Sequence, residues 1–93
     1  MITSFANKEA EKLFATGESK KLPPEIIICS IMRLTQLDSA REVTYLLIPP
    51  SNRLETLSRD RAGQWSIRIN DQLRICFRFT NGEATDVEIT DYH

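Results

Sequence analysis

Residues 64–90 read QWSIRINDQLRICFRFTNGEATDVEIT, and apolar side chains occupy every second position through most of this stretch. A period of two is typical of β-strands that bury one face. The alternation breaks at Asn70-Asp71 and at Asn81-Gly82, and both dipeptides favour two-residue hairpin turns. The stretch therefore predicts an antiparallel meander with strands over 64–69, 72–79 and 84–90. Its inward-facing residues are Trp65, Ile67, Ile69, Leu73, Ile75, Phe77, Phe79, Val87 and Ile89.

The residues ahead of this stretch show the wider period of amphipathic helices. Residues 7–15 predict a short helix that Asn7 caps and Gly17 ends. Residues 24–37 predict a second helix with Pro24 in its first turn. Isoleucines 26–28 would also suit a strand, but the apolar pattern persists over helical length. One or two more helical turns are expected over 40–46, ahead of Pro49-Pro50. Because helices that precede a half-buried sheet cover its apolar face, the sequence predicts one α+β domain over residues 1–93.

The composition is that of a folded soluble domain. At 41% hydrophobic and 27% charged residues, the chain is neither disordered in character nor rich enough in apolar residues for a membrane protein. The longest apolar runs, 26–29 and 45–48, are far shorter than the about 20 residues that span a bilayer. Residues 1–5 lack the layout of a signal peptide, so we expect a cytoplasmic location. Cys29 and Cys76 are then expected to be reduced, and without a Cys/His cluster the ligand count excludes a structural zinc site.

The net charge of −1 hides an arginine-rich segment. Between positions 53 and 78 there are six arginines, no lysine and three acids. Guanidinium groups contact phosphate in a bidentate manner and stack on bases, which lysine ammonium groups cannot do. From charge alone, a solvated sheet face with ion pairs is an equally good interpretation. Strand alternation sets one group of residues on the face away from the helices: Ser66, Arg68, Gln72, Arg74, Arg78, Glu88 and Tyr92.

The chain closes on Asp91-Tyr92-His93, which includes its only histidine. Histidine is the one side chain whose unperturbed pKa lies near neutrality, so it can both take and give a proton there. Terminal residues are often frayed and tolerant of change, which is the simpler interpretation of this segment. The arginines upstream favour the alternative, a site that combines positive charge with a proton-transfer group.

Four segments together resemble the HigB toxins, also called proteic killer or plasmid maintenance system killer proteins, within the RelE-like superfamily. They are NRLETL at 52–57, DRAGQWSIRINDQ at 60–72, RICF at 74–77 and DVEITDYH at 86–93. Each segment alone is a weak signal, but together they are specific. With residues 2–5, Leu13-Phe14 and Pro49-Pro50, which also fit, the resemblance covers nearly the whole chain.

The resemblance implies a RelE-like fold, with N-terminal helices packed on one face of a twisted antiparallel sheet. It implies an endoribonuclease that cleaves translated mRNA in the ribosomal A site, without a metal or other cofactor. It further implies a helix-turn-helix antitoxin of the HigA type, with operator DNA bound only through the toxin–antitoxin complex and no membrane partner. Family catalytic roles fall on Arg74, Asp91, Tyr92 and His93, and a base-contacting role falls on Gln72. The neighbouring arginines Arg59, Arg61 and Arg68 are the further candidates for RNA contacts.

Two departures from the family pattern bear on activity rather than on reaction class. Ser58-Arg59 stands where Lys-Gly is common, so either Arg59 replaces the phosphate-holding lysine or activity is reduced. Leu73 stands where tryptophan is common, which removes an aromatic surface near the base-contacting loop. The alternative function is therefore a catalytically weak relative that binds ribosome or antitoxin and acts as an operator co-repressor. A free-standing RNA-binding protein is disfavoured, because the sheet lacks interleaved aromatic residues.

Overall fold

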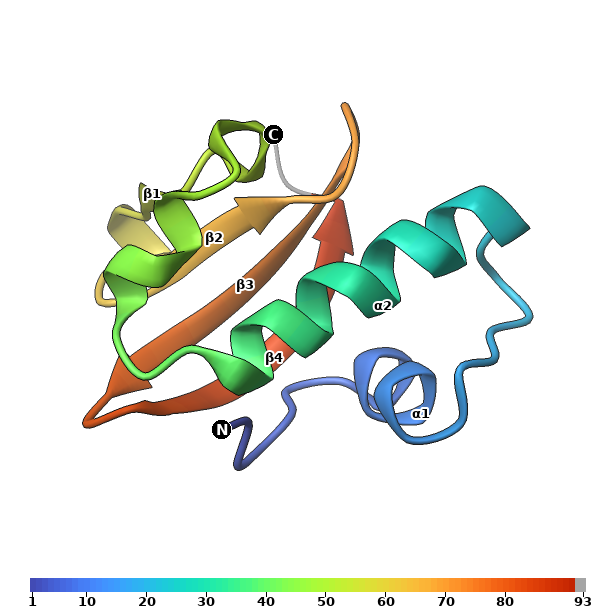
Figure 1. Ribbon diagram of the computed structural model, residues 1–93, viewed down its shortest axis with the longest axis horizontal. Helices are drawn as coiled ribbons and strands as arrows, with labels where there is room; N and C mark the ends of the chain where they lie inside the picture. Colours follow the sequence, from blue (N-terminus) through green and yellow to red (C-terminus); the bar gives the residue numbers. More distant parts are fainter. Residues whose placement is uncertain (92–93) are drawn as a thin grey trace.

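A computed structural model of the chain, which describes residues 1–91, shows two helices packed on one face of a four-stranded antiparallel sheet (Figure 1). No helix within residues 1–91 is long and apolar enough to cross a membrane. The strands pair in the order β1-β2-β3-β4, as a meander. The helices are α1 (Lys8–Thr16) and α2 (Pro24–Ser39), followed by the short 3-10 helices η1 (Val43–Leu47), η2 (Pro50–Asn52) and η3 (Arg59–Arg61). The strands are β1 (Glu55–Thr56), β2 (Trp65–Arg68), β3 (Leu73–Thr80) and β4 (Glu83–Asp91). The predicted α+β class is confirmed.

Local signals set the ends of both helices. The Asn7 side chain accepts a hydrogen bond of 3.0 Å from the Ala10 amide and so caps α1. Gly17 ends α1 in the left-handed region at φ 73°, where a residue without Cβ is favoured. Pro24 occupies the first turn of α2, where its missing N–H costs no hydrogen bond. The predicted helices 7–15 and 24–37 are thus confirmed, with ends displaced by one or two residues.

The core lies between the helices and the sheet. Leu13 from α1, Leu34 and Leu37 from α2, and Phe77 from β3 are fully buried within it. The prediction of inward-facing residues is confirmed for the central set, and Trp65, Leu73 and Phe79 are half-buried against that core. The confirmed central residues are Ile67, Ile69, Ile75, Phe77, Val87 and Ile89.

The two predicted hairpin turns differ in outcome. Asn81 (φ 53°) and Gly82 (φ 81°) form a two-residue turn between the paired residues Thr80 and Glu83, as expected. The predicted two-residue turn at Asn70-Asp71 is wrong, because β2 and β3 are joined by the four residues 69–72. The Asn70 side chain accepts hydrogen bonds from the amides of Gln72 (2.9 Å) and Leu73 (2.7 Å). Asparagine therefore shapes a wider loop through its side chain.

Two features of β4 could not be predicted from the alternation of apolar and polar residues. Between the pairs Cys76–Glu88 and Arg78–Thr85 the strand gains one residue, and Asp86 adopts φ 52° there. This β-bulge lets Ala84 and Val87, three positions apart, both face the core. The N-terminal segment also forms parallel bridges to β4, at Ile2–Ala84 and Phe5–Val87. These bridges cover an edge that would otherwise be open to pairing with another chain.

The connection from α2 to the sheet is fixed by one buried amide. Asn52 is fully buried, and its Nδ2 donates to Gln36 Oε1 of α2 (3.0 Å) and to the Leu46 carbonyl (3.1 Å). Arg53 follows immediately in the left-handed region, at φ 47°. These hydrogen bonds therefore fix the position of the backbone that enters β1.

The burial of α2 predicts a contrast between two of its apolar residues. Leu34→Ala should lower the free energy of unfolding by about 2–5 kcal/mol, because it removes a fully buried side chain and leaves a cavity. Met32→Ala in the same helix should change it by less than about 0.5 kcal/mol, since Met32 is 62% exposed. Urea unfolding of both variants measures the difference. Equal effects would contradict the placement of α2.

Candidate functional site

The sheet face away from the helices carries two rows of polar side chains. One row crosses all four strands through the successive pairs Glu55–Ser66, Ser66–Cys76 and Cys76–Glu88. The adjacent row joins Arg68 of β2, Arg74 of β3 and Thr90 of β4. Because side chains of paired residues lie on the same face, these residues form one surface.

Arg74 is the most enclosed arginine of this surface, and its side chain is only 13% exposed. Its Nε donates to the Ser66 hydroxyl (2.8 Å), and its Nη2 donates to the Arg53 carbonyl (2.7 Å). Nη2 also lies 3.8 Å from Glu55 Oε2. A guanidinium held at two of its nitrogens presents a fixed positive group, as recognition of a phosphate requires.

Arg61 reaches over the same face from η3. Its Nη1 donates to Glu88 Oε1 (2.5 Å) and to Gln64 Oε1 (3.1 Å). Beneath this group Cys76 is fully buried. Burial raises the pKa of the Cys76 thiol, Arg61 and Arg74 act to lower this pKa, and Glu88 acts to raise it. The thiol therefore remains neutral at physiological pH, below two positive side chains.

The other predicted RNA-contacting residues lie around this centre. Arg68 pairs with Asp71 in the 69–72 loop and keeps 28% of its side chain exposed. Gln72 is exposed in the same loop rather than on a strand, contrary to the predicted strand start at residue 72. Arg59 is exposed on η3, at φ 57°. The structure thus groups Arg61, Arg68 and Arg74 on one face and sets Arg59 and Gln72 at its periphery.

The sequence did not indicate the contacts of two residues of this surface, Glu55 and Ser66. Glu55 is the carboxylate paired with Arg74, and its Oε2 lies 3.8 Å from Arg74 Nη2. The two-residue β1 has no periodicity that could have indicated this pairing. Ser66 was expected on an open face, yet it is fully buried, as is Cys76, because arginine side chains cover the middle of the sheet. The face is therefore less open than alternation alone predicted.

The terminal triad is only partly within the described residues. Asp91 is exposed, ends β4 and pairs with Leu73, one position from the Arg74–Thr90 pair. Tyr92 and His93 lie outside the described residues, so their predicted roles stay predictions. Within residues 1–91, no group of three or more His, Cys, Asp or Glu side chains could hold a metal ion.

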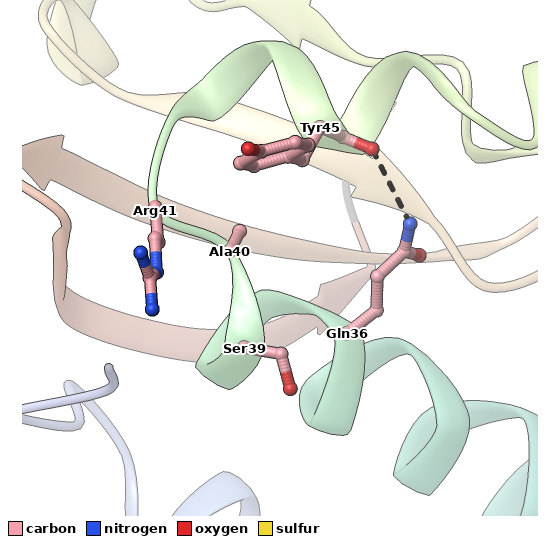
Figure 2. A pocket seen from close by; sticks show the side chains of 5 residues that line it. All are labelled: Gln36, Ser39, Ala40, Arg41 and Tyr45. Carbon is pink, nitrogen blue, oxygen red and sulfur yellow. Dashed lines mark hydrogen bonds between the residues drawn. The ribbon is translucent and has the colours of Figure 1, made fainter.

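A hollow of about 380 Å³ lies elsewhere, where α2 ends and η1 begins (Figure 2). The Gln36 side chain lines one side of it and donates to the Tyr45 carbonyl (3.5 Å). Its lining residues are Gln36, Ser39, Ala40, Arg41 and Tyr45, and none of the predicted site residues is among them. The candidate site is therefore the arginine-bearing sheet face and not this hollow.

Comparison with known sequences assigns the chain to a toxin family. Residues 3–93 match the family of HigB-like toxins, described as the RelE-like toxin of the type II toxin-antitoxin system HigB. Endoribonuclease HigB of Proteus vulgaris is 36% identical over 97 residues, which covers 100% of both chains. Toxin HigB-1 of Vibrio cholerae is 35% identical over 85 residues, which covers 90% of each chain.

Solved structures agree with this assignment at the level of the fold. The YoeB-YefM complex of Staphylococcus aureus contains a chain with a TM-score of 0.63 and 15% identity, covering 100% of this chain and 98% of that one. The toxin-antitoxin complex RelBE2 of Mycobacterium tuberculosis gives a TM-score of 0.51 at 16% identity, covering 99% and 96%. The expected RelE-like arrangement of helices on an antiparallel sheet is confirmed.

The buried thiol predicts a pH dependence of stability. The unfolded Cys76 thiol loses its proton near the ordinary pKa of 9.0, whereas the folded thiol, with its raised pKa, keeps it. The unfolded state then binds fewer protons, so the free energy of unfolding should fall as pH rises above about 9. Below that pH the thiol is neutral in both states, and its full contribution to the free energy of unfolding is present. Urea unfolding of wild type and Cys76→Ala between pH 7 and 10 measures it, because groups common to both proteins cancel in the difference. Parallel curves would contradict a raised pKa.

Proposed function

We propose that this chain, which belongs to the family of RelE-like toxins of the type II toxin-antitoxin system HigB, is an endoribonuclease that cleaves mRNA on the ribosome. The observation that carries the proposal is the enclosed, two-point-anchored guanidinium of Arg74 beside Arg61 and Arg68. The name Endoribonuclease HigB, given to a relative that aligns over the whole chain, supports the same reaction.

Cleavage of an RNA strand by its own 2′-hydroxyl has three requirements. The hydroxyl must lose a proton, the pentacoordinate phosphorus must be stabilised, and the departing 5′-oxygen must gain a proton. Arg74 supplies the charge that stabilises the phosphorus centre, helped by Arg68 or Arg59. Because guanidinium groups supply this charge, we propose a reaction that needs no metal and leaves a 2′,3′-cyclic phosphate.

The proton transfers are assigned to the terminal triad. His93 is the general acid or base, since histidine is the side chain whose ordinary pKa lies near neutrality. Tyr92 positions the substrate or donates an auxiliary proton, and Asp91 orients His93 or the hydroxyl. The short distance in register between Asp91 and the Arg74–Thr90 pair supports a site where β4 ends. Because one histidine does not easily act as acid and base together, the ribosome or the RNA supplies the second group.

The candidate residues around Arg74 would also hold the RNA strand. Arg59, Arg61 and Arg68 are spread from η3 to the end of β2 and contact phosphates, while Gln72 contacts a base from the 69–72 loop. Arg61 and Arg68 each pair with a carboxylate in the structure, so RNA phosphates replace Glu88 and Asp71 as their partners. Asp71 is 96% exposed, and ion pairs at the surface contribute only about 0–1 kcal/mol, so the exchange at Arg68 costs little.

The partner that controls the toxin is an antitoxin. Solved structures that share this fold include toxin-antitoxin complexes, which supports such a partner here. We propose a HigA-like helix-turn-helix antitoxin that neutralises the toxin in the cytoplasm, and operator DNA that is bound only through the complex. Induction of the chain alone and with this antitoxin, followed by growth and by mapping of mRNA ends, tests the proposal. Normal growth with intact message would contradict it.

A second function is favoured by one feature, the exposed Ser58-Arg59 where the family commonly has Lys-Gly. A catalytically weak toxin would still bind ribosome and antitoxin and act as operator co-repressor. Growth arrest or repression without cut message would identify this function. Cut message that disappears in an Arg74 variant would exclude it.

The assignment of Arg74 predicts that cleavage is lost even when the positive charge at this position is kept. Arg74→Lys keeps the positive charge but removes the planar fork, and it should lower single-turnover cleavage on translating ribosomes by about 10²- to 10³-fold. Arg78→Lys is the matched control on the same strand, because Arg78 is 44% exposed and pairs with Asp86. It should cleave like wild type. Normal cleavage by Arg74→Lys and Arg74→Ala would remove Arg74 from the mechanism.

The histidine assignment makes a separate prediction. His93→Ala should lower cleavage by about 10²- to 10⁴-fold, the usual effect of losing a positioned acid or base. Thermal unfolding of the same protein separates a chemical effect from a loss of fold. Near-normal cleavage with unchanged melting would remove His93 from the mechanism and leave Arg74 and Tyr92.

A further inference from the structure

We infer that Ser66 is the positioning residue for Arg74, and that its hydroxyl fixes the guanidinium so that the Nη1 end faces an RNA phosphate. The inference rests on the proposed function, because Ser66 acts only through Arg74. It adds a residue for which neither the charge pattern nor the family resemblance predicted a role.

The first observation is the environment of the Ser66 hydroxyl. Ser66 lies in the middle of β2 and is fully buried, and its Oγ accepts the Arg74 Nε–H at 2.8 Å. Ser30 of α2 is also fully buried, yet its Oγ finds no hydrogen-bond partner within residues 1–91. Burial of a serine in this fold therefore does not by itself bring a partner. The Ser66 bond is a specific arrangement of the two side chains.

The second observation is an independent anchor on the other side of the same group. The Arg53 carbonyl accepts from Arg74 Nη2 at 2.7 Å, and Arg53 adopts the left-handed conformation (φ 47°, ψ 56°). A non-glycine residue in that region costs about 1–2 kcal/mol, which the surrounding contacts must offset. Asn52, whose buried amide is bonded to α2 and η1, holds this backbone in place. Two anchors on a planar group fix its rotation.

The third observation concerns the donors that remain. A guanidinium has five N–H donors, of which Nη1 carries two. Within residues 1–91, hydrogen bonds occupy Nε and Nη2 of Arg74, and none is found for Nη1. Glu55 lies at 3.8 Å from Nη2 and is 55% exposed, so an incoming anion can replace it. The end opposite the Ser66 bond is therefore the end available to a phosphate.

These observations assign different tasks to the contacts of Arg74. The buried bond to Ser66 and the bond to the Arg53 carbonyl persist when RNA binds, because the Nη1 donors bind the phosphate and neither bond has to break. The long ion pair with Glu55 is exchanged. An arginine oriented before the substrate arrives needs no reorganisation at the moment of reaction. Loss of one anchor lets the guanidinium rotate, and misplacement by about 1 Å can cost about 100-fold in rate.

The test begins with Ser66→Ala and the matched control Ser30→Ala. We expect Ser66→Ala to lower single-turnover cleavage on translating ribosomes by about 10- to 100-fold. Ser30→Ala, which removes an equally buried hydroxyl without a hydrogen bond, should cleave like wild type. Thermal unfolding sets an assay temperature at which every variant is folded. Ser66→Thr, which keeps the acceptor oxygen, should recover most of the activity.

A double-mutant cycle distinguishes positioning from a general structural role. In an Arg74→Lys protein the Nε donor is absent, so adding Ser66→Ala should have almost no further effect on cleavage. An equal loss in both backgrounds would overturn the inference and make Ser66 a structural residue. Normal cleavage by Ser66→Ala would overturn it as well, whether or not Ser66→Thr folds.

Failure of the inference is separable from failure of the proposed function. Loss of cleavage in Arg74→Lys with normal cleavage in Ser66→Ala removes the positioning role alone. Normal cleavage in both Arg74→Lys and Arg74→Ala removes the catalytic assignment and the inference together. A wild-type protein that cuts no message overturns the enzymatic function, and the inference with it.

Discussion

Burial of the central strand on both of its faces is the constraint on which the rest of the structure depends. Ile75, Cys76 and Phe77 are consecutive in β3, and all three are fully buried. Ile75 and Phe77 fill the core beneath α1 and α2, whereas Cys76 lies under Arg61 and Arg74. The helices and the arginine-bearing surface are thus built on opposite sides of the same three residues. A shift of register by one position would exchange the two surfaces and destroy both.

Carboxylates on or beside the arginine-bearing face offset much of its positive charge. The chain as a whole has a net charge of −1, although six arginines lie between positions 53 and 78. Arg61 pairs with Glu88, Arg68 with Asp71, Arg74 with Glu55 and Arg78 with Asp86. Most of these pairs are partly exposed and weak, so they keep the guanidinium groups oriented without binding them tightly. Under the proposed function, RNA binding at this face would be an exchange of carboxylates for phosphates. The affinity for RNA should then depend on how the guanidinium groups are oriented rather than on a large net positive charge.

The parts of the fold that alternation and turn chemistry govern were predictable from the sequence. Ile67 and Ile75 follow the period of two, and Asn81-Gly82 takes the backbone conformation that its residues favour. Three features were not predictable, because each depends on a contact between distant segments. The bulge at Asp86, the bridges from residues 1–6 and the two-residue β1 have no period in the sequence. The wider loop at 69–72 follows from two side-chain hydrogen bonds of Asn70 that composition does not predict.

The same reasoning explains what was recognised of the site. Parity placed Arg68 and Arg74 on one face, since both lie in strands with a clear period. Glu55 and the Arg53 carbonyl reach Arg74 only because β1 pairs with β2, which no local pattern indicates. The role of Ser66 depends on the direction of a single side chain, and parity alone suggested an exposed position.

The neutral thiol of Cys76 completes the electrostatics of this face. An ionised sulfur beneath Arg61 and Arg74 would attract both guanidinium groups and compete with a phosphate for them. Burial raises the pKa of Cys76 despite the two arginines, so the sulfur remains uncharged at neutral pH. Ser66 and Cys76 therefore act in complementary ways on the guanidinium group of Arg74. The first orients the positive charge through a hydrogen bond, and the second fills the space below it without neutralising it.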